Sequence, residues 1–172
     1  VIKRCTARKV CIDHHASNGG FGDVDIIDDE ASAAGELIYD LLLNMGVRIT
    51  PQIATALHVA IGTDTGWFRH PNTSPRSMEI CARLIEFGSN PQFIFQKLYE
   101  ELTWERTKLV EMCLGALRSA ADGRIAYMGI TREMFRKSGA TDDETEGIVD
   151  IMRTIQGVQI IILARETPEG KV

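Results

Sequence analysis

The sequence lacks an excess of basic residues, and it lacks long apolar runs. Its 19 lysines and arginines stand against 24 aspartates and glutamates, so the formal net charge is −5. A surface that coats nucleic acid in general is basic, and this charge argues against one. It does not exclude a small anionic substrate held by a local cluster of metal and arginine. The apolar runs, such as residues 158–164, are far too short to span a bilayer, so we expect no membrane partner.

Paired cysteines and targeting signals are also lacking. The four cysteines are Cys5, Cys11, Cys81 and Cys113, and none form the CxxC pair of a zinc knuckle or redox motif. We expect them to be reduced and mostly buried. The first four residues have neither the apolar core nor the cleavage pattern of a signal peptide. Together these features predict a cytoplasmic protein.

The overall composition is that of a globular protein. Apolar residues make up 44% and charged residues 25% of the 172 residues, which is enough to bury a core in one domain or in pieces of two. The chain begins with valine and ends at Lys171 and Val172, where another strand is expected after the turn at residues 168–170. We therefore expect a fragment, or a chain with parts missing.

Hydrophobic spacing predicts an α/β protein in two parts. Short β-branched runs predict strands at residues 9–12, 24–27, 124–130 and 158–165, with the first strand buried and parallel to its neighbour. Apolar periodicity and capping residues predict helices at residues 31–45, 50–64, 75–88, 90–102, 103–121, 131–137 and 142–155. We place a parallel-sheet domain at 1–102, a connector helix at 103–121 and a smaller α/β domain from 122 to 172.

Three titratable residues follow the first predicted strand directly. Asp13, His14 and His15 come after the apolar run that ends at Ile12, and the carboxyl ends of strands are where open α/β sheets bind ligands. Two imidazoles and one carboxylate are a dense set of metal ligands. The alternative is a solvated corner between strand and loop. The residues alone leave both interpretations open.

A fourth ionisable residue, Asp64, comes at the end of an otherwise apolar helix. An unpaired buried carboxylate is costly, so its side chain needs a partner. One interpretation is a turn residue bonded to the backbone of Thr65 or Gly66. The other is an anionic metal ligand that meets His14 across a cleft, in a site with open positions that suits Mn²⁺ in a hydrolase.

Three more residues are candidates for binding a substrate phosphate. Arg76 lies at the start of a predicted helix, where the helix N-terminus favours anions, and arginine grips phosphate with two hydrogen bonds. Asn72 precedes the same helix, and Arg69 borders Asp64 together with His70. A solvated surface position is the ordinary alternative for both arginines.

Four motifs in order resemble the DHH phosphoesterase superfamily. Residues 10–15 read VCIDHH, residues 33–36 read AAGE, residues 62–68 read GTDTGWF and residues 72–76 read NTSPR. Within the superfamily the chain is most similar to the bacterial oligoribonuclease and 3′-phosphoadenosine-5′-phosphate phosphatase branch, often called nanoRNase. Residues 139–149 resemble the start of the family's DHH-associated C-terminal domain, so the resemblance covers almost the whole chain.

The resemblance implies a site for two metal ions, usually Mn²⁺, with Mg²⁺ or Co²⁺ as alternatives. His14 and Asp64 would ligate one ion, His15 would contact the scissile phosphate or assist the leaving group, and Asp13 would orient an imidazole. The implied reaction is hydrolysis of short oligoribonucleotides or 3′-phosphoadenosine-5′-phosphate by an activated water. Residues 1–102 would be the C-terminal part of the DHH domain, and residues 122–172 the N-terminal part of the substrate-binding domain. Short RNA or a nucleotide phosphate is the expected partner, and a homodimer stays possible.

Other functions remain open on the same motifs. Cyclic-dinucleotide phosphodiesterases, inorganic pyrophosphatases and single-strand exonucleases of the superfamily resemble them too. A non-catalytic nucleotide-binding relative is an alternative from another class, although Asp13, His14, His15 and Asp64 are all present. The family's first motif, its second-motif aspartate and its GGGH stretch are absent from these residues, so we expect about half of the metal site here.

A chain with half a site should be inactive by itself. We predict that the 172-residue segment alone hydrolyses neither a nucleotide phosphate nor a short oligoribonucleotide in the presence of Mn²⁺, because the ligands of the second ion are not in it. Phosphate release and product chromatography measure this. Robust turnover would contradict the prediction.

Overall fold

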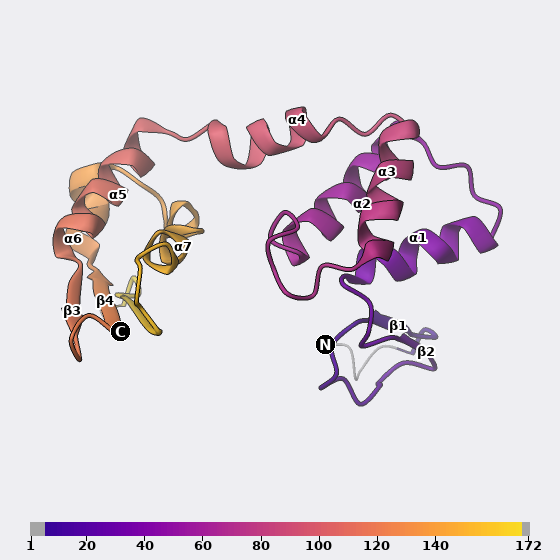
Figure 1. Cartoon of the computed structure of the whole chain (residues 1–172), viewed down its shortest axis with the longest axis horizontal. Coiled ribbons are helices and arrows are strands. Elements are labelled where there is room, and N and C mark those ends of the chain that lie inside the picture. The colour runs from indigo at the N-terminus through magenta and orange to yellow at the C-terminus, as the bar shows by residue number, and fades with distance from the viewer. Residues whose placement is uncertain (1–5, 170–172) are drawn as a thin grey trace. The chain divides into compact units, whose positions relative to one another are not determined.

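The computed structural model describes residues 6–169, which form two compact units divided between Glu100 and Glu101. Each unit has its own core and is described by itself (Figure 1). The predicted α/β class is confirmed. The predicted domain limits at residues 1–102, 103–121 and 122–172 stay a prediction.

The first unit combines a small parallel sheet with a layer of helices. Strands β1 (Val10–Asp13) and β2 (Val24–Ile27) are parallel, with Asp13 paired to Ile27 at their carboxyl ends. The helices are α1 (Ala34–Asn44), α2 (Pro51–Asp64), α3 (Pro75–Glu86), α4 (Pro91–Phe95) and the π-helix η2 (Gln96–Glu100). Their shared core is made of Ala33, Tyr39, Ile49, Ala54, Leu57, Ile61, Ile80, Cys81 and Leu84.

Side-chain caps set where the helices of this unit begin. Thr50 Oγ1 accepts the Ile53 amide at 3.3 Å at the start of α2, and Pro51 occupies the first helical turn. Ser74 and Ser77 form a capping box at the start of α3, as each side chain accepts the other's backbone amide. These helix starts agree with those predicted from the sequence. The start of α2 also fixes the direction of the helix that carries Asp64.

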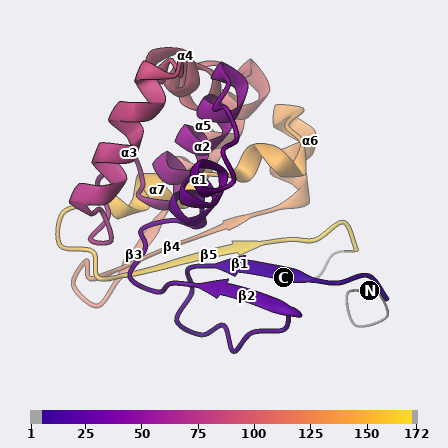
Figure 2. The same ribbon diagram turned by 90° about the vertical axis from the view of Figure 1, so that its right-hand side faces the viewer.

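The second unit is a three-stranded sheet with helices packed on it. Strand β4 (Ile125–Ile130) pairs antiparallel with β3 (Arg118–Ala120) and parallel with β5 (Ile160–Arg165), which lie side by side in Figure 2. The helices are α5 (Trp104–Ala116), α6 (Arg132–Ser138), the 3₁₀ helix η3 (Asp142–Thr145) and α7 (Ile148–Arg153). Its core contains Leu109, Cys113, Ala126, Met128, Ile130, Phe135, Ala140, Ile148 and Met152.

Two predicted helices of the second unit are wrong, one at its end and one in its interior. The helix expected to reach residue 121 stops at Ala116, because the next residues pair with β4 through a turn of left-handed residues that ends at Gly123 (φ 84°). The helix expected over residues 142–155 is broken at Gly147, whose φ of 76° separates η3 from α7.

Three expectations for the first unit also need correction. The helix expected at 31–45 begins only at Ala34, and the helix expected at 90–102 changes to π geometry at Gln96 and ends at Glu100. Strand β1 was expected to be buried, yet Val10 is 59% exposed. In the described part of the chain β1 has one neighbouring strand, so its other edge has no strand partner there.

The described cysteines behave as expected. Cys11, Cys81 and Cys113 are buried and free, and burial raises the pKa of the Cys81 thiol to about 11. Cys5 and the strand expected at Lys171 and Val172 lie outside the described residues. Between residues 6 and 169, no helix combines the length and the apolar character that crossing a membrane requires.

The contact between α1 and α2 leaves no room for a side chain at Gly35. A Cβ there would lie 3.1 Å from both Ala60 Cβ and Ile61 Cγ1. We predict that Gly35→Val lowers the free energy of unfolding by about 1–3 kcal/mol, the usual cost of overpacking a core. Urea unfolding measures it. Gly115→Val in α5 is the matched control, since nothing lies within 4 Å of a Cβ there, and an equal loss in both variants would contradict this account.

Candidate metal and phosphate site

The candidate site begins where β1 ends. Asp13 is the last residue of the strand, and His14 and His15 follow it directly. Because β1 and β2 are parallel, their carboxyl ends open at one edge of the sheet, where ligands of α/β proteins bind. The structure therefore brings the predicted tripeptide to the expected edge.

Asp13 is the anchor of this corner. Its Oδ1 accepts the His14 amide at 2.8 Å, the His15 amide at 3.3 Å and His15 Nδ1 at 2.6 Å, and its Oδ2 accepts the Asn18 side-chain amide. The hydrogen bond from His15, followed by that from Asn18, holds the pKa of the Asp13 carboxyl well below its usual range. In return, the Asp13 hydrogen bond raises the pKa of His15 above 6.5. Asp13 is thus ionised and fixes the orientation of His15.

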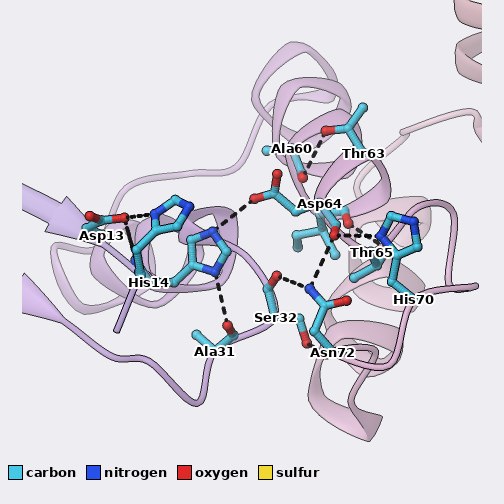
Figure 3. A network of polar contacts seen from close by, with 12 residues as sticks. Asp13, His14, Ala31, Ser32, Ala60, Thr63, Asp64, Thr65, His70 and Asn72 are labelled. Atoms are coloured by element: carbon cyan, nitrogen blue, oxygen red, sulfur yellow. Dashed lines mark hydrogen bonds and ion pairs between the residues drawn. The ribbon is translucent and has the colours of Figure 1, made fainter. Parts of the chain in front are cut away.

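His14 turns the other way, toward α2 (Figure 3). Its Nδ1 lies 3.2 Å from the Ala31 carbonyl oxygen, which can only accept a hydrogen bond, so Nδ1 carries the proton. Its Nε2 then faces Asp64 Oδ2 at 3.4 Å. The structure therefore brings together the two residues that the sequence pairs as metal ligands, from positions 50 residues apart.

The chemistry of this pair fits a metal ion. In the neutral tautomer, Nε2 presents a lone pair to a carboxylate oxygen, and two such atoms repel each other unless a cation or a proton lies between them. An imidazole whose other nitrogen donates to a carbonyl is the common form of a metal-bound histidine. Between residues 6 and 169, no cluster of three or more His, Cys, Asp or Glu side chains could hold a metal. His14 and Asp64 thus form a pair of potential ligand atoms, and their role as metal ligands stays a prediction.

An unusual turn delivers Asp64 at the end of α2. Gly66, Trp67 and Phe68 have φ angles of 55°, 55° and 63°, a left-handed run that costs energy in the two aromatic residues. Buried Thr65 holds the turn, since its Oγ1 donates to Ile61 O at 2.7 Å and accepts the Phe68 amide at 3.2 Å. Strain of this kind is retained where the surroundings impose it, and here it adjoins a candidate ligand.

The Trp67 ring is used for packing. It makes edge contacts with Phe95 and Tyr99, and a Cβ on Gly62 would lie 3.1 Å from it. The ring therefore packs within the first unit, beside the turn that carries Asp64.

The two arginines expected near a phosphate have partners within the protein. Arg76 pairs with Asp40 of α1 at 2.5 Å and lines a groove of about 470 Å³ between α1 and α3, whose lining includes neither His14 nor Asp64. Arg69 Nε donates to the Gly66 carbonyl at 2.8 Å. Their roles in substrate binding stay predictions.

Asn72, the third candidate, lies against the site. Its side-chain amide donates to Ser32 O at 3.0 Å and to Asp64 O at 3.2 Å. Two residues of the site, Ser32 and Ala31, were not predicted from the sequence. Ser32 directly precedes the AAGE motif, which is the one sequence signal that could have pointed to it.

Comparisons with known proteins find relatives over nearly the whole chain. It is 28% identical over 92% of its length to a bifunctional oligoribonuclease and PAP phosphatase NrnA of Thermus thermophilus, and 28% identical over 89% to that of Bacillus subtilis. An uncharacterized protein of Mycoplasma genitalium is 31% identical over 88%. The chain spans about half of these relatives, 47%, 49% and 45% respectively. No family model matches the chain.

One solved structure is similar to nearly the whole chain as well. The crystal structure of an exopolyphosphatase-related protein from Bacteroides fragilis matches 95% of this chain and 49% of its own, with a TM-score of 0.88 and 27% identity. The predicted resemblance to the oligoribonuclease and PAP phosphatase branch of the DHH phosphoesterases is therefore confirmed.

The pair of Asp13 and His15 gives a test of the site's electrostatics. The folded state raises the pKa of His15, so the pair adds stability fully below pH 6.5 and loses it as the pH rises through the raised value. Asp13, with its lowered pKa, loses its contribution only in strong acid. We predict that Asp13→Asn brings the His15 pKa down toward 6.5 in the metal-free protein, as measured by NMR titration of the ring protons.

The control removes a different carboxylate of the same unit. Asp23 bonds to Lys9, and the carboxylates that raise the pKa of His15 are Asp13 and Asp64, so Asp23→Asn should leave the His15 titration unchanged. A His15 pKa that does not respond to Asp13→Asn would show that the 2.6 Å contact does not set it.

Proposed function

We propose that this chain forms part of a metal-dependent phosphoesterase that hydrolyses short oligoribonucleotides, 3′-phosphoadenosine-5′-phosphate, or both. The observation that carries the proposal is the facing pair of His14 Nε2 and Asp64 Oδ2, 3.4 Å apart at the carboxyl end of a parallel strand. The names of the relatives from Thermus thermophilus and Bacillus subtilis support the substrate class.

His14 and Asp64 would hold one divalent ion, for which we propose Mn²⁺, with Mg²⁺ and Co²⁺ as alternatives. Imidazole and carboxylate together suit such ions. When bound, the metal would lower the pKa of a water molecule and neutralise negative charge on the substrate phosphate. The chain's part is to fix the two ligands, through the Ala31 carbonyl on one side and the end of α2 on the other.

His15 would act on the phosphate. Its side chain is 69% exposed, and its Nδ1 is bonded to Asp13, which leaves Nε2 directed away from that bond. Because Asp13 raises its pKa, His15 holds a proton in neutral solution more readily than a free histidine. A protonated imidazole can bind a phosphate oxygen or donate a proton to the leaving group. Asp13 serves as the residue that positions it.

The runner-up functions keep this site and change the substrate. Cyclic-dinucleotide phosphodiesterases and single-strand exonucleases need the same ligands. A non-catalytic nucleotide-binding relative would not need them, and the preserved pair argues against it. We propose further that the protein acts in the cytoplasm. We also propose a homodimer, for which the family resemblance is the one argument.

The central test removes one ligand with little change in shape. In the protein as its gene encodes it, we predict that Asp64→Asn lowers Mn²⁺-dependent hydrolysis by more than about 100-fold. Removing a residue that only orients a metal ligand already lowers metal affinity or activity by about 10–100-fold, and a ligand itself should matter more. Asp29→Asn, an exposed position in the same unit, is the matched control and should retain full activity.

The substrates to compare are 3′-phosphoadenosine-5′-phosphate, a short oligoribonucleotide and a cyclic dinucleotide. We expect the first two to be hydrolysed faster than the third. Chelation should abolish activity in every case, and adding back each metal ion ranks Mn²⁺, Mg²⁺ and Co²⁺. Retained metal-dependent activity in Asp64→Asn would refute the ligand assignment.

A further inference from the structure

The side-chain amide of Asn72 contacts the backbone beside each of the two candidate ligands. The Asn72 nitrogen lies 3.0 Å from Ser32 O and 3.2 Å from Asp64 O. Both neighbours are backbone carbonyls, which only accept hydrogen bonds, so the group that faces them must be the NH₂ and not the oxygen. Asn72 thus uses both of its N–H bonds inside the protein.

Ser32 returns the contact. Ser32 is 1% exposed, and its hydroxyl donates to the Asn72 backbone carbonyl at 2.6 Å and lies 3.1 Å from Ser74 Oγ at the start of α3. We call these reciprocal bonds the Ser32–Asn72 clamp. Ser74 itself belongs to the capping box of α3, so the clamp is attached to a helix end that is held in place.

The clamp acts on the two candidate ligands through the backbone (Figure 3). On one side, Ser32 follows Ala31, whose carbonyl accepts His14 Nδ1 at 3.2 Å and sets the tautomer and direction of that ring. On the other side, the side-chain amide of Asn72 donates to the backbone carbonyl of Asp64 itself. His14 and Asp64 belong to a strand end and a helix end 50 residues apart, and Asn72 connects the backbone that holds each.

The clamp also bears on the expectation that Asn72 binds substrate. With both N–H bonds in use, the free polar atom of its side chain is the oxygen, which can only accept. Phosphate oxygens are acceptors as well, so this atom does not suit an anionic substrate. The geometry therefore favours a role inside the protein.

We propose that Asn72 is a positioning residue that, with Ser32, sets the separation of His14 and Asp64 for a divalent ion. The proposal rests on the proposed function, since it assumes that these two residues are ligands. Removing a residue that orients a metal ligand typically weakens metal affinity or activity by about 10–100-fold. The clamp should therefore be visible in metal binding itself, before any turnover.

The experiment measures the affinity for Mn²⁺ by the electron paramagnetic resonance signal of the free ion, in the full gene product. The reference is the binding that His14→Ala and Asp64→Ala abolish. Asn72→Ala should weaken that binding by about tenfold or more. Asn72→Gln keeps the two N–H donors on a longer side chain and should recover part of the loss. Asn44→Ala, exposed at the end of α1, is the matched control and should bind like the wild type.

Each outcome decides between roles for Asn72. Weaker Mn²⁺ binding, with a KM at saturating Mn²⁺ equal to that of the wild type, supports the clamp. Unchanged Mn²⁺ binding with a raised KM would show a substrate contact and overturn it. Unchanged Mn²⁺ binding with only a lower Tm would show a merely structural role and also overturn it.

A second variant keeps the proposal testable if Asn72→Ala does not fold. Ser32→Ala removes only the hydroxyl that donates to Asn72 O, and it should weaken Mn²⁺ binding in the same direction by a smaller factor. Unchanged affinity in Ser32→Ala would then overturn the clamp. If the wild type binds no Mn²⁺ through His14 and Asp64, the proposed function fails first, which is distinct from failure of the clamp alone.

Discussion

The His14 imidazole is held by one hydrogen bond, from Nδ1 to the Ala31 carbonyl, and this bond determines what the rest of the site can do. It places a proton on Nδ1 and directs Nε2 at Asp64 Oδ2. A lone pair and a carboxylate at that distance are unfavourable in isolation, and a divalent cation turns the same geometry into a favourable one. The other features of the first unit serve this arrangement. Asp13 fixes the strand end, the strained turn after α2 fixes Asp64, and Asn72 spans the two.

The roles that we propose for the two histidines differ because their partners differ. His14 has a neutral acceptor behind it and a carboxylate in front, which is the setting of a ligand. His15 has an ionised carboxylate behind it and solvent in front, which is the setting of a proton donor or phosphate contact. Adjacent residues point in different directions because Asp13 accepts both of their amides while it takes only the ring of His15.

Much of this could be predicted from the sequence, for reasons that concern particular residues. A β-branched run before Asp13 predicts a strand end, and Thr50 and Ser74 before proline predict the starts of α2 and α3. The pairing of His14 with Asp64 came from ligand chemistry and family resemblance. The Ala31 carbonyl had no signal, because every residue has a carbonyl. The role of Asn72 could not be found either, since its two partners are backbone atoms. The break at Gly147 and the strand after Ala116 depend on pairing and packing within the second unit, which local periodicity does not report.

The proposed site depends most on a metal ion between His14 Nε2 and Asp64 Oδ2. Crystals of the protein as its gene encodes it, grown with Mn²⁺ and measured on both sides of the manganese absorption edge, test this directly. We predict an anomalous peak within bonding distance of His14 Nε2 and Asp64 Oδ2, with His14 Nδ1 still hydrogen-bonded to the Ala31 carbonyl oxygen. A His14 Nε2–Asp64 Oδ2 contact that stays direct at saturating Mn²⁺, with no anomalous peak beside it, would contradict a metal ion at this site.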